Sequence, residues 1–153
     1  MRILIAVDGS SFSDAAIAEV ARRPWPSGSE IKVLSVFEMP LPVTPEAWAI
    51  PPQYFEELDN SVRSRAKAIV ETAIEKLRQS LEQSVTVSGE YVQGAPKHVI
   101  LDEAKSWHAD LIVVGSHGYR AWERFLLGSV SQAIVAHADC SVEVVRSPIP
   151  VEK

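Results

Sequence analysis

The sequence predicts an α/β fold: an open, doubly wound, five-stranded parallel sheet with helices on both faces. Two observations predict it. Five short segments rich in β-forming residues recur along the chain, and most are apolar at successive positions, as strands buried on both faces are. Between them lie segments whose apolar residues are three and four positions apart, which is typical of amphipathic helices. Alternating strands and helices indicate a parallel sheet between helical layers.

The composition is that of one ordinary globular domain spanning 1–153, with 46% hydrophobic and 23% charged residues. The 15 basic and 20 acidic residues give a net charge of −5. This charge argues against sequence-independent binding of nucleic acid and against an anionic membrane surface as partner. The longest apolar runs are far shorter than a membrane span of about 20 residues. Cys140 is the single cysteine, which excludes an internal disulfide and a multi-cysteine metal site. We therefore expect a cytoplasmic protein.

The first elements are a strand, a helix and a second strand. Residues 3–7 form an apolar run that predicts the first strand. The following helix has Ser11 and Asp14 as a weak capping box, and it ends before Pro24, which cannot continue a helix. Residues 31–37 are rich in β-branched and aromatic types and predict the second strand.

A proline-rich stretch interrupts the alternation. Five of the ten prolines fall within residues 39–52, and proline locks φ and lacks a backbone donor, so we expect an irregular loop over 40–55. Apolar residues at helical spacing then predict a long amphipathic helix over about 56–81. The third strand is expected over 85–92, weakened by Gly89.

The second half continues the alternation. Gly94-Ala95-Pro96 opens a helix, because proline is harmless near a first helical turn. Residues 111–114 predict the most buried strand, residues 129–136 a helix and residues 142–145 the fifth strand. The proline-rich tail 147–153 is expected to fray.

Two turns are candidate sites. In open parallel sheets, ligands bind beyond the carboxyl ends of the strands, where the strand order reverses. Residues 8–11 follow the first strand, and residues 115–118 follow the fourth. Both turns combine glycine with polar residues, so we expect the chemistry of the protein to lie there.

The glycines after the fourth strand predict a phosphate cradle. Gly115, Gly118 and Gly128 are three of only seven glycines, and Gly128 precedes Ser129 at an expected helix start. Glycine lets backbone amides approach a ligand, and a helix N-terminus adds unpaired donors and about half a positive charge. The alternative is structural: the glycines only turn the chain, and Ser129 with Gln132 forms a capping box that needs no ligand.

Other candidate residues remain open. Asp8 either accepts from a ligand hydroxyl or is a turn aspartate that bonds its own backbone, and the serines at 10, 11 and 13 leave a flavin-phosphate site of flavodoxin type as a further alternative. His117 lies beside the glycine turn without an identifiable carboxylate partner, and the other histidines are scattered singly, so no metal cluster is predicted. Cys140 is expected to pack rather than react. The chain contains neither GxxxxGK[ST] nor GxGxxG.

The spacing Gly115-x2-Gly118-x9-Gly128-Ser129 resembles the nucleotide-binding signature of the universal stress protein family. The resemblance covers nearly the whole chain, because ILIAVDGS, the Gly94-Ala95-Pro96 turn, ADLIVVGSHG, LLGSVSQAIV and ADCSVEVVR look like the family's blocks in order and spacing. That family has ATP-binding and non-binding branches, and this sequence keeps the glycines of the binding branch. The resemblance also implies the strand order 3-2-1-4-5, with the switch point between strands one and four.

The resemblance implies ATP, or ADP or AMP, as ligand, with Mg²⁺ carried on the nucleotide and touched by Ser129 or Asp8. It implies that adenosine lies against Ala6, Val7 and Asp8, and that adenine meets backbone groups of Val36. It implies that the ribose and phosphates are lined by Val114, Gly115, Ser116, His117 and Gly118. The residues implied to receive phosphates are Gly128, Ser129, Val130 and Ser131.

The sequence departs from the family locally. Tyr119 and Trp122 are bulkier than the residues common between the second and third glycines, and they either stack on a ligand or fill part of the pocket, with packing preferred for Trp122. Arg120 and Arg124 either add charge near the phosphates or form a solvated face.

The predicted function is nucleotide binding in a stress response. An ATPase needs a positioned water, a charge-neutralising cation and usually a base, and only the cradle is evident, so we expect slow hydrolysis at most rather than an enzyme. Val142, Val144 and Val145 form an apolar edge strand if the implied order holds, which favours a homodimer through that edge. The alternatives are a dimerising interaction module without a physiological nucleotide and a slow ATP hydrolase.

Overall fold

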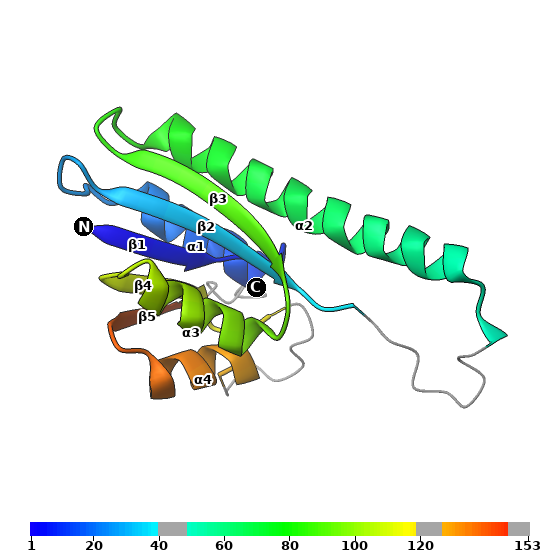
Figure 1. The fold of residues 1–153 in the computed structure, drawn as a ribbon. Helices are drawn as coiled ribbons and strands as arrows, with labels where there is room; N and C mark the ends of the chain where they lie inside the picture. Colours follow the sequence, from blue (N-terminus) through cyan, green and yellow to red (C-terminus); the bar gives the residue numbers. More distant parts are fainter. Residues whose placement is uncertain (40–48, 119–126, 147–153) are drawn as a thin grey trace, which may run out of the picture.

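The computed structural model describes residues 1–39, 49–118 and 127–146. Within these ranges the strands and helices alternate as predicted (Figure 1). In chain order they are β1 (Arg2–Ala6), α1 (Ser11–Ala21), β2 (Glu30–Phe37), α2 (Pro52–Ser80), β3 (Thr86–Gln93), α3 (Pro96–Ser106), β4 (Leu111–Gly115), α4 (Ser129–His137) and β5 (Ser141–Val145).

The five strands form one parallel sheet in the order β3-β2-β1-β4-β5. The predicted fold class and the strand order implied by the resemblance are both confirmed. The chain builds outward from β1 to β3 and then crosses to β4 on the other side of β1 (Figure 1). The reversal of strand order therefore lies between β1 and β4, where open α/β sheets bind their ligands.

Helices cover both faces of the sheet because successive strand residues point to opposite sides. Ile3 and Ile5 of β1 pack with α1 and α2, where Val20 and Leu77 are buried in the same cluster. Between them, Leu4 points to the other face. It belongs to the cluster formed with buried residues of α3 and α4, namely Ile100, Ala104 and Ile134.

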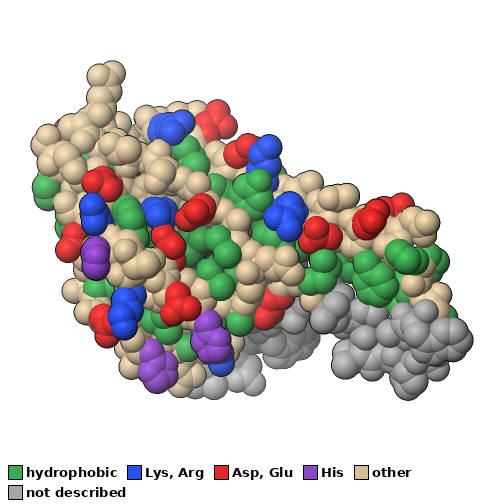
Figure 2. All heavy atoms as spheres, viewed as in Figure 1, with side chains coloured by type: hydrophobic (Ala, Val, Ile, Leu, Met, Phe, Trp, Pro, Cys, Tyr) green, Lys and Arg blue, Asp and Glu red, His purple; other side chains and the backbone are tan. Residues whose placement is uncertain are grey.

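Helix α2 begins at Pro52, four residues before the expected start. Residues 52–55 are therefore helical rather than part of the expected irregular loop, because proline fits the first turn of a helix; residues 40–48 lie outside the described part of the chain. The buried residues of α2 are Ala66, Val70, Ala73 and Leu77. Its earlier turns reach beyond the sheet and carry apolar side chains, including the exposed Tyr54 (Figures 1 and 2).

Gly89, which the sequence analysis expects to weaken the third strand, lies where α2 packs closely against β3. A Cβ at this position would lie 2.5 Å from Val70 Cγ1 and 2.6 Å from Ile74 Cδ1. β3 runs unbroken through Gly89 and pairs with β2 along eight residues. The missing side chain therefore serves the packing of helix on sheet.

Charged side chains of both signs are interspersed over the face seen in Figure 2. The longest described helix, α2, is too polar to cross a bilayer, and no other described helix meets the requirement either.

Candidate functional site

A cavity opens at the carboxyl ends of β1 and β4, at the reversal of strand order. Its volume is about 120 Å³. Ten of the predicted site residues line it: Ala6, Val7, Asp8, Val36, Val114, Gly115, His117, Gly118, Val130 and Ser131. The lining residues that sequence reasoning missed are Ser13, Leu34, Pro96 and Ile100.

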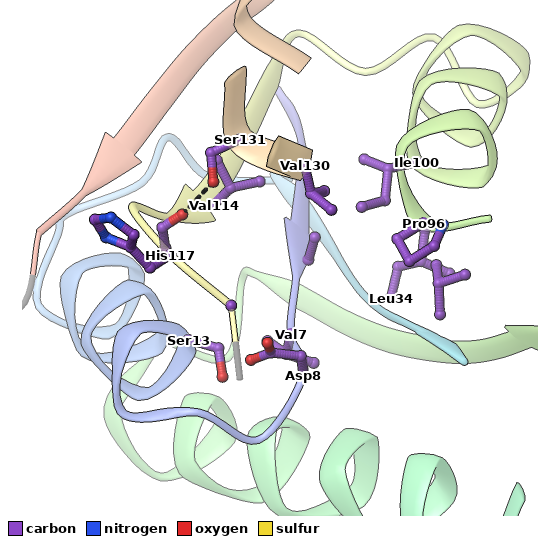
Figure 3. Close-up of a pocket in the computed structure, with 14 residues that line it drawn as sticks. Val7, Asp8, Ser13, Leu34, Pro96, Ile100, Val114, His117, Val130 and Ser131 are labelled. Atoms are coloured by element: carbon purple, nitrogen blue, oxygen red, sulfur yellow. Dashed lines mark hydrogen bonds between the residues drawn. The ribbon is translucent and has the colours of Figure 1, made fainter. Parts of the chain in front are cut away.

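The two glycine-containing stretches, 115–118 and 128–131, are in direct contact. The Gly128 N–H donates to the Ser116 carbonyl at 2.8 Å. The Ser131 hydroxyl donates to the Gly115 carbonyl at 2.7 Å (Figure 3). A Cβ on Gly128 would lie 3.2 Å from His117 Cα. The end of β4 and the start of α4 therefore form one wall of the cavity.

Asp8 faces this wall from the end of β1. A Cβ on Gly118 would lie 3.0 Å from Asp8 Oδ2. The other carboxylate oxygen, Oδ1, accepts from the Ser10 N–H at 3.0 Å, which is the turn bond considered as the structural alternative for this residue. One carboxylate thus holds its own turn and also borders the glycine turn after β4.

The N-terminus of α4 carries no side-chain cap. Its N-cap residue is Gly128, and Ser129 is already helical, so the capping box expected for Ser129 and Gln132 is not formed. The first amides of a helix have no acceptor within it, and here they begin beside the turn after β4. This end of α4 therefore presents backbone donors and the positive end of the helix dipole.

The N-terminus of α1 is capped by serines instead. Its N-cap is Ser10, one residue before the expected Ser11. The Ser10 hydroxyl accepts from the Ser13 N–H at 3.2 Å, and the Ser13 hydroxyl donates to the Ser10 carbonyl at 3.0 Å. Both side chains are buried. Because these groups are engaged in the cap, the arrangement disfavours the flavodoxin-like alternative and leaves α4 as the better anion site.

Comparison with known proteins decides the family. The model of the Universal stress protein family matches residues 1–146. The chain belongs to the universal stress protein family. Universal stress protein YxiE of Bacillus subtilis is 32% identical over 148 residues, covering 95% of this chain and 98% of that protein.

Solved structures of this family share the fold. Universal stress protein UspA from Lactobacillus plantarum superposes with a TM-score of 0.75 at 27% identity, covering 95% of this chain and 97% of that one. A universal stress protein family protein from Arabidopsis thaliana, solved with AMP bound, superposes with a TM-score of 0.69 at 22% identity over 99% and 97% of the two chains.

In this universal stress protein another side of the cavity is apolar. Leu34 comes from β2, while Pro96 and Ile100 come from the first turns of α3 (Figure 3). From the sequence, Ile100 is an ordinary core position and Pro96 an ordinary helix start. Periodicity does not separate them from other core residues, because α3 reaches the cavity only through the crossover from β3 to β4, which carries it over β2 and β1.

Two residues at the end of β4, Gly115 and Ser116, have structural roles here. Gly115 packs against α1, since a Cβ there would lie 2.7 Å from the carbonyl carbon of Phe12. Ser116 is buried and does not line the cavity; its hydroxyl lies 3.1 Å from His117 Nδ1. Gly128 and Ser129 border the cavity wall without lining the cavity itself.

His117 is not arranged as a general base. Its ring centroid lies 5.1 Å from that of Phe12, and its Nε2 is buried with no hydrogen-bond partner among the described residues. Among the described residues no group of His, Cys, Asp and Glu is placed to hold a metal ion. Burial raises the pKa of the Cys140 thiol, with the Asp110 and Asp139 charges adding to the effect. The Cys140 side chain is partly buried and packs against the core cluster that includes residues of α3 and α4.

The residues that depart from the family pattern, Tyr119, Arg120, Trp122 and Arg124, lie outside the described ranges.

Proposed function

We propose that this universal stress protein binds an adenine nucleotide, ATP or its products ADP and AMP, at the cavity between β1 and β4. One observation carries the proposal: the turn after β4 and the uncapped start of α4 meet beside Asp8 at the reversal of strand order. This arrangement combines an anion site for the phosphates, a hydrogen-bond acceptor for a ribose hydroxyl and an apolar wall for the base.

The base binds against the apolar wall. Leu34, Pro96 and Ile100 offer a surface for the faces of a purine, and the backbone of Val36 offers hydrogen-bonding groups to its edge. The cavity is smaller than the roughly 300–1,000 Å³ of a complete small-molecule pocket. It therefore takes the base and part of the sugar, while the phosphates extend over the start of α4.

The sugar and phosphates bind to the opposite side. Asp8 accepts from a ribose hydroxyl, and the amides of Ser129, Val130 and Ser131 receive phosphate oxygens at the positive end of α4. Hydrogen bonds to a charged group contribute roughly 1.5–3 kcal/mol each. Three or four of them, together with the base contacts, supply the roughly −8 kcal/mol of micromolar binding.

The AMP-bound neighbour from Arabidopsis supports an adenine nucleotide in this fold. Mg²⁺ would be carried by the polyphosphate, and the Ser129 hydroxyl or Asp8 would be its ligand from the protein. The histidine nearest the site, His117, bonds Ser116 rather than a carboxylate, which supports binding with slow hydrolysis at most.

Self-association accompanies nucleotide binding in this proposal. β5 is an edge of the sheet, and Val142 and Val144 lie along it. An unpaired edge strand pairs readily with a second copy through a two-fold axis. The resulting homodimer acts in the cytoplasm as a nucleotide-responsive component of a stress response.

The test begins with the protein as purified. After denaturation, chromatography of the released small molecules is expected to yield an adenine nucleotide. Calorimetric titration of nucleotide-free protein with ATP, ADP, AMP and GTP measures the preference for adenine. An absence of released adenine nucleotide, together with no heat from ATP at millimolar concentration, overturns the proposal.

A further inference from the structure

One edge of β5 pairs with no other strand of the described residues, and it presents the backbone groups of alternate residues. The Val145 carbonyl accepts from the Ser116 N–H at 2.8 Å, so the backbone of Val145 points inward to β4. Backbone groups alternate in direction along a strand, as they do in every ladder. The N–H and C=O groups of Val142 and Val144 therefore point outward, toward any strand that pairs with this edge.

This alternation selects one register for two copies related by a two-fold axis. Such an axis makes the β5 strands antiparallel. Only full overlap pairs both outward residues with residues of β5 itself, Val142 with Val144 of the second copy and the reverse. Glu143 then stands opposite its own counterpart, in the non-hydrogen-bonded pair whose Cα atoms are about 4.5 Å apart and whose side chains are closest. Two carboxylates meet on the same face of the joined sheet.

In this chain the carboxylate of Glu143 is already paired with Arg23, which follows the end of α1. The guanidinium donates from Nη1 to Glu143 Oε2 at 2.7 Å and from Nη2 to Oε1 at 2.6 Å. It also donates to Glu19 Oε1 from Nε at 2.9 Å and from Nη2 at 2.6 Å. Arg22 bonds the other oxygen of Glu19. The four side chains carry two positive and two negative charges.

We infer that Arg23 permits self-association by charge neutralisation. It neutralises the Glu143 carboxylate, which would otherwise face a second Glu143 carboxylate across the two-fold axis. The inference rests on the self-association in the proposed function. The recognised partner is a second copy of this chain. Like charges directly opposite each other in a sheet are destabilising, so removal of Arg23 converts the centre of the interface into a repulsive pair.

The experiment measures the dimer dissociation constant by sedimentation velocity over a range of protein concentrations. We expect Arg23→Gln to raise that constant about fivefold or more at low salt. The rise is expected to shrink at about 1 M salt, where the Debye length is about 3 Å. The matched control is Arg22→Gln, because Arg22 bonds Glu19 and its side chain is 71% exposed.

The double variant Arg23→Gln/Glu143→Gln distinguishes charge neutralisation by Arg23 from a merely structural bond between the end of α1 and β5. The double variant also lacks that bond, yet it has no carboxylates at the axis, so its dissociation constant is expected to return to the wild-type value. An unchanged constant in Arg23→Gln, or an equally raised constant in the double variant, overturns the inference.

A cysteine variant tests the register. In a Cys140→Ser background, Glu143→Cys places one cysteine of each copy opposite the other. Their Cα atoms then lie within the range of about 4.4–6.8 Å found for disulfides, so mild oxidation is expected to give a covalent dimer. Ser141→Cys is the control, since residue 141 faces residue 145 of the second copy. Cross-linking through residue 141 and not through residue 143 overturns the register.

Titration of the same samples with ATP separates the two proposals. A wild-type protein that stays monomeric at every concentration overturns both the dimer and the role of Arg23 in it. ATP binding in that sample leaves the nucleotide site standing. A wild-type protein that dimerises but does not bind ATP overturns the nucleotide site and leaves the dimer and the role of Arg23 standing.

Discussion

The Ser131 hydroxyl donates a 2.7 Å hydrogen bond to the Gly115 carbonyl, and this bond joins the first turn of α4 to the last residue of β4. Both residues line the cavity. The bond sets where the amides of α4 begin relative to the glycine turn. The proposed phosphate site therefore depends on a contact between residues sixteen positions apart.

We expect Ser131→Ala to lower the free energy of unfolding by about 1–3 kcal/mol, because the buried Gly115 carbonyl loses its donor. Urea denaturation monitored by circular dichroism measures this change. ATP affinity is expected to fall as well, since α4 is no longer tied to β4. Ser129→Ala, at an exposed position of the same helix turn, is the stability control; an equal loss in both variants contradicts the role given to the bond.

Gly118→Val is expected to weaken ATP binding at least about tenfold, or about 1.4 kcal/mol. A Cβ at residue 118 would lie 3.0 Å from Asp8 Oδ2, and the added methyl groups narrow the gap between the two sides of the cavity. Gly118 is exposed, so unfolding is expected to change little. Calorimetry with Ser88→Val as control checks this, and undiminished ATP affinity contradicts the placement of the nucleotide between Asp8 and the glycine turn.

Gly115→Ala is expected to act on the fold rather than on the ligand. The added Cβ would lie 2.7 Å from the carbonyl carbon of Phe12, which is backbone and moves only with α1. Overpacking of this kind lowers the free energy of unfolding by about 1–3 kcal/mol. Thermal unfolding without nucleotide measures it. An alanine variant as stable as the wild type shows that α1 is not held as closely as the contact indicates.

Glu19 is expected to make stability depend on pH. Hydrogen bonds from Arg22 and Arg23 hold the pKa of Glu19 below its usual range in the folded protein. Its contribution is therefore present above the unfolded pKa of about 4.3 and is lost as the pH falls through the lowered folded pKa. The difference in Tm between the wild type and Glu19→Gln is expected to narrow on acidification. Glu57→Gln, at the exposed start of α2, serves as control.

Cys140 is expected to react slowly with alkylating reagents near neutral pH. Burial raises the pKa of its thiol, so the reactive thiolate forms only at higher pH than in a free cysteine. The rate of iodoacetamide labelling, followed by mass spectrometry with and without denaturant, checks this. Equal rates in the native and the denatured protein at pH 7 contradict the packed position of the side chain.

Much of the fold was predictable because periodicity reports which side of each element is buried. The continuous apolar run at residues 111–114 predicted a strand covered on both faces, and in the structure β4 is buried throughout. The spacing of apolar residues likewise predicted α2. Its start was placed too late because the prolines that indicate a loop, such as Pro52, are equally compatible with the first turn of a helix.

The two glycine turns could also be found from the sequence, since a short turn after a strand is a local pattern. The apolar side of the cavity could not be found in this way. Pro96 and Ile100 reach it only because the crossover from β3 to β4 carries α3 over β2 and β1. Arg23 and Glu143 are separated by 120 residues, and no periodicity relates them. Burial patterns can be predicted from residues that are close in the sequence, whereas contacts of this kind depend on the order in which the strands pair.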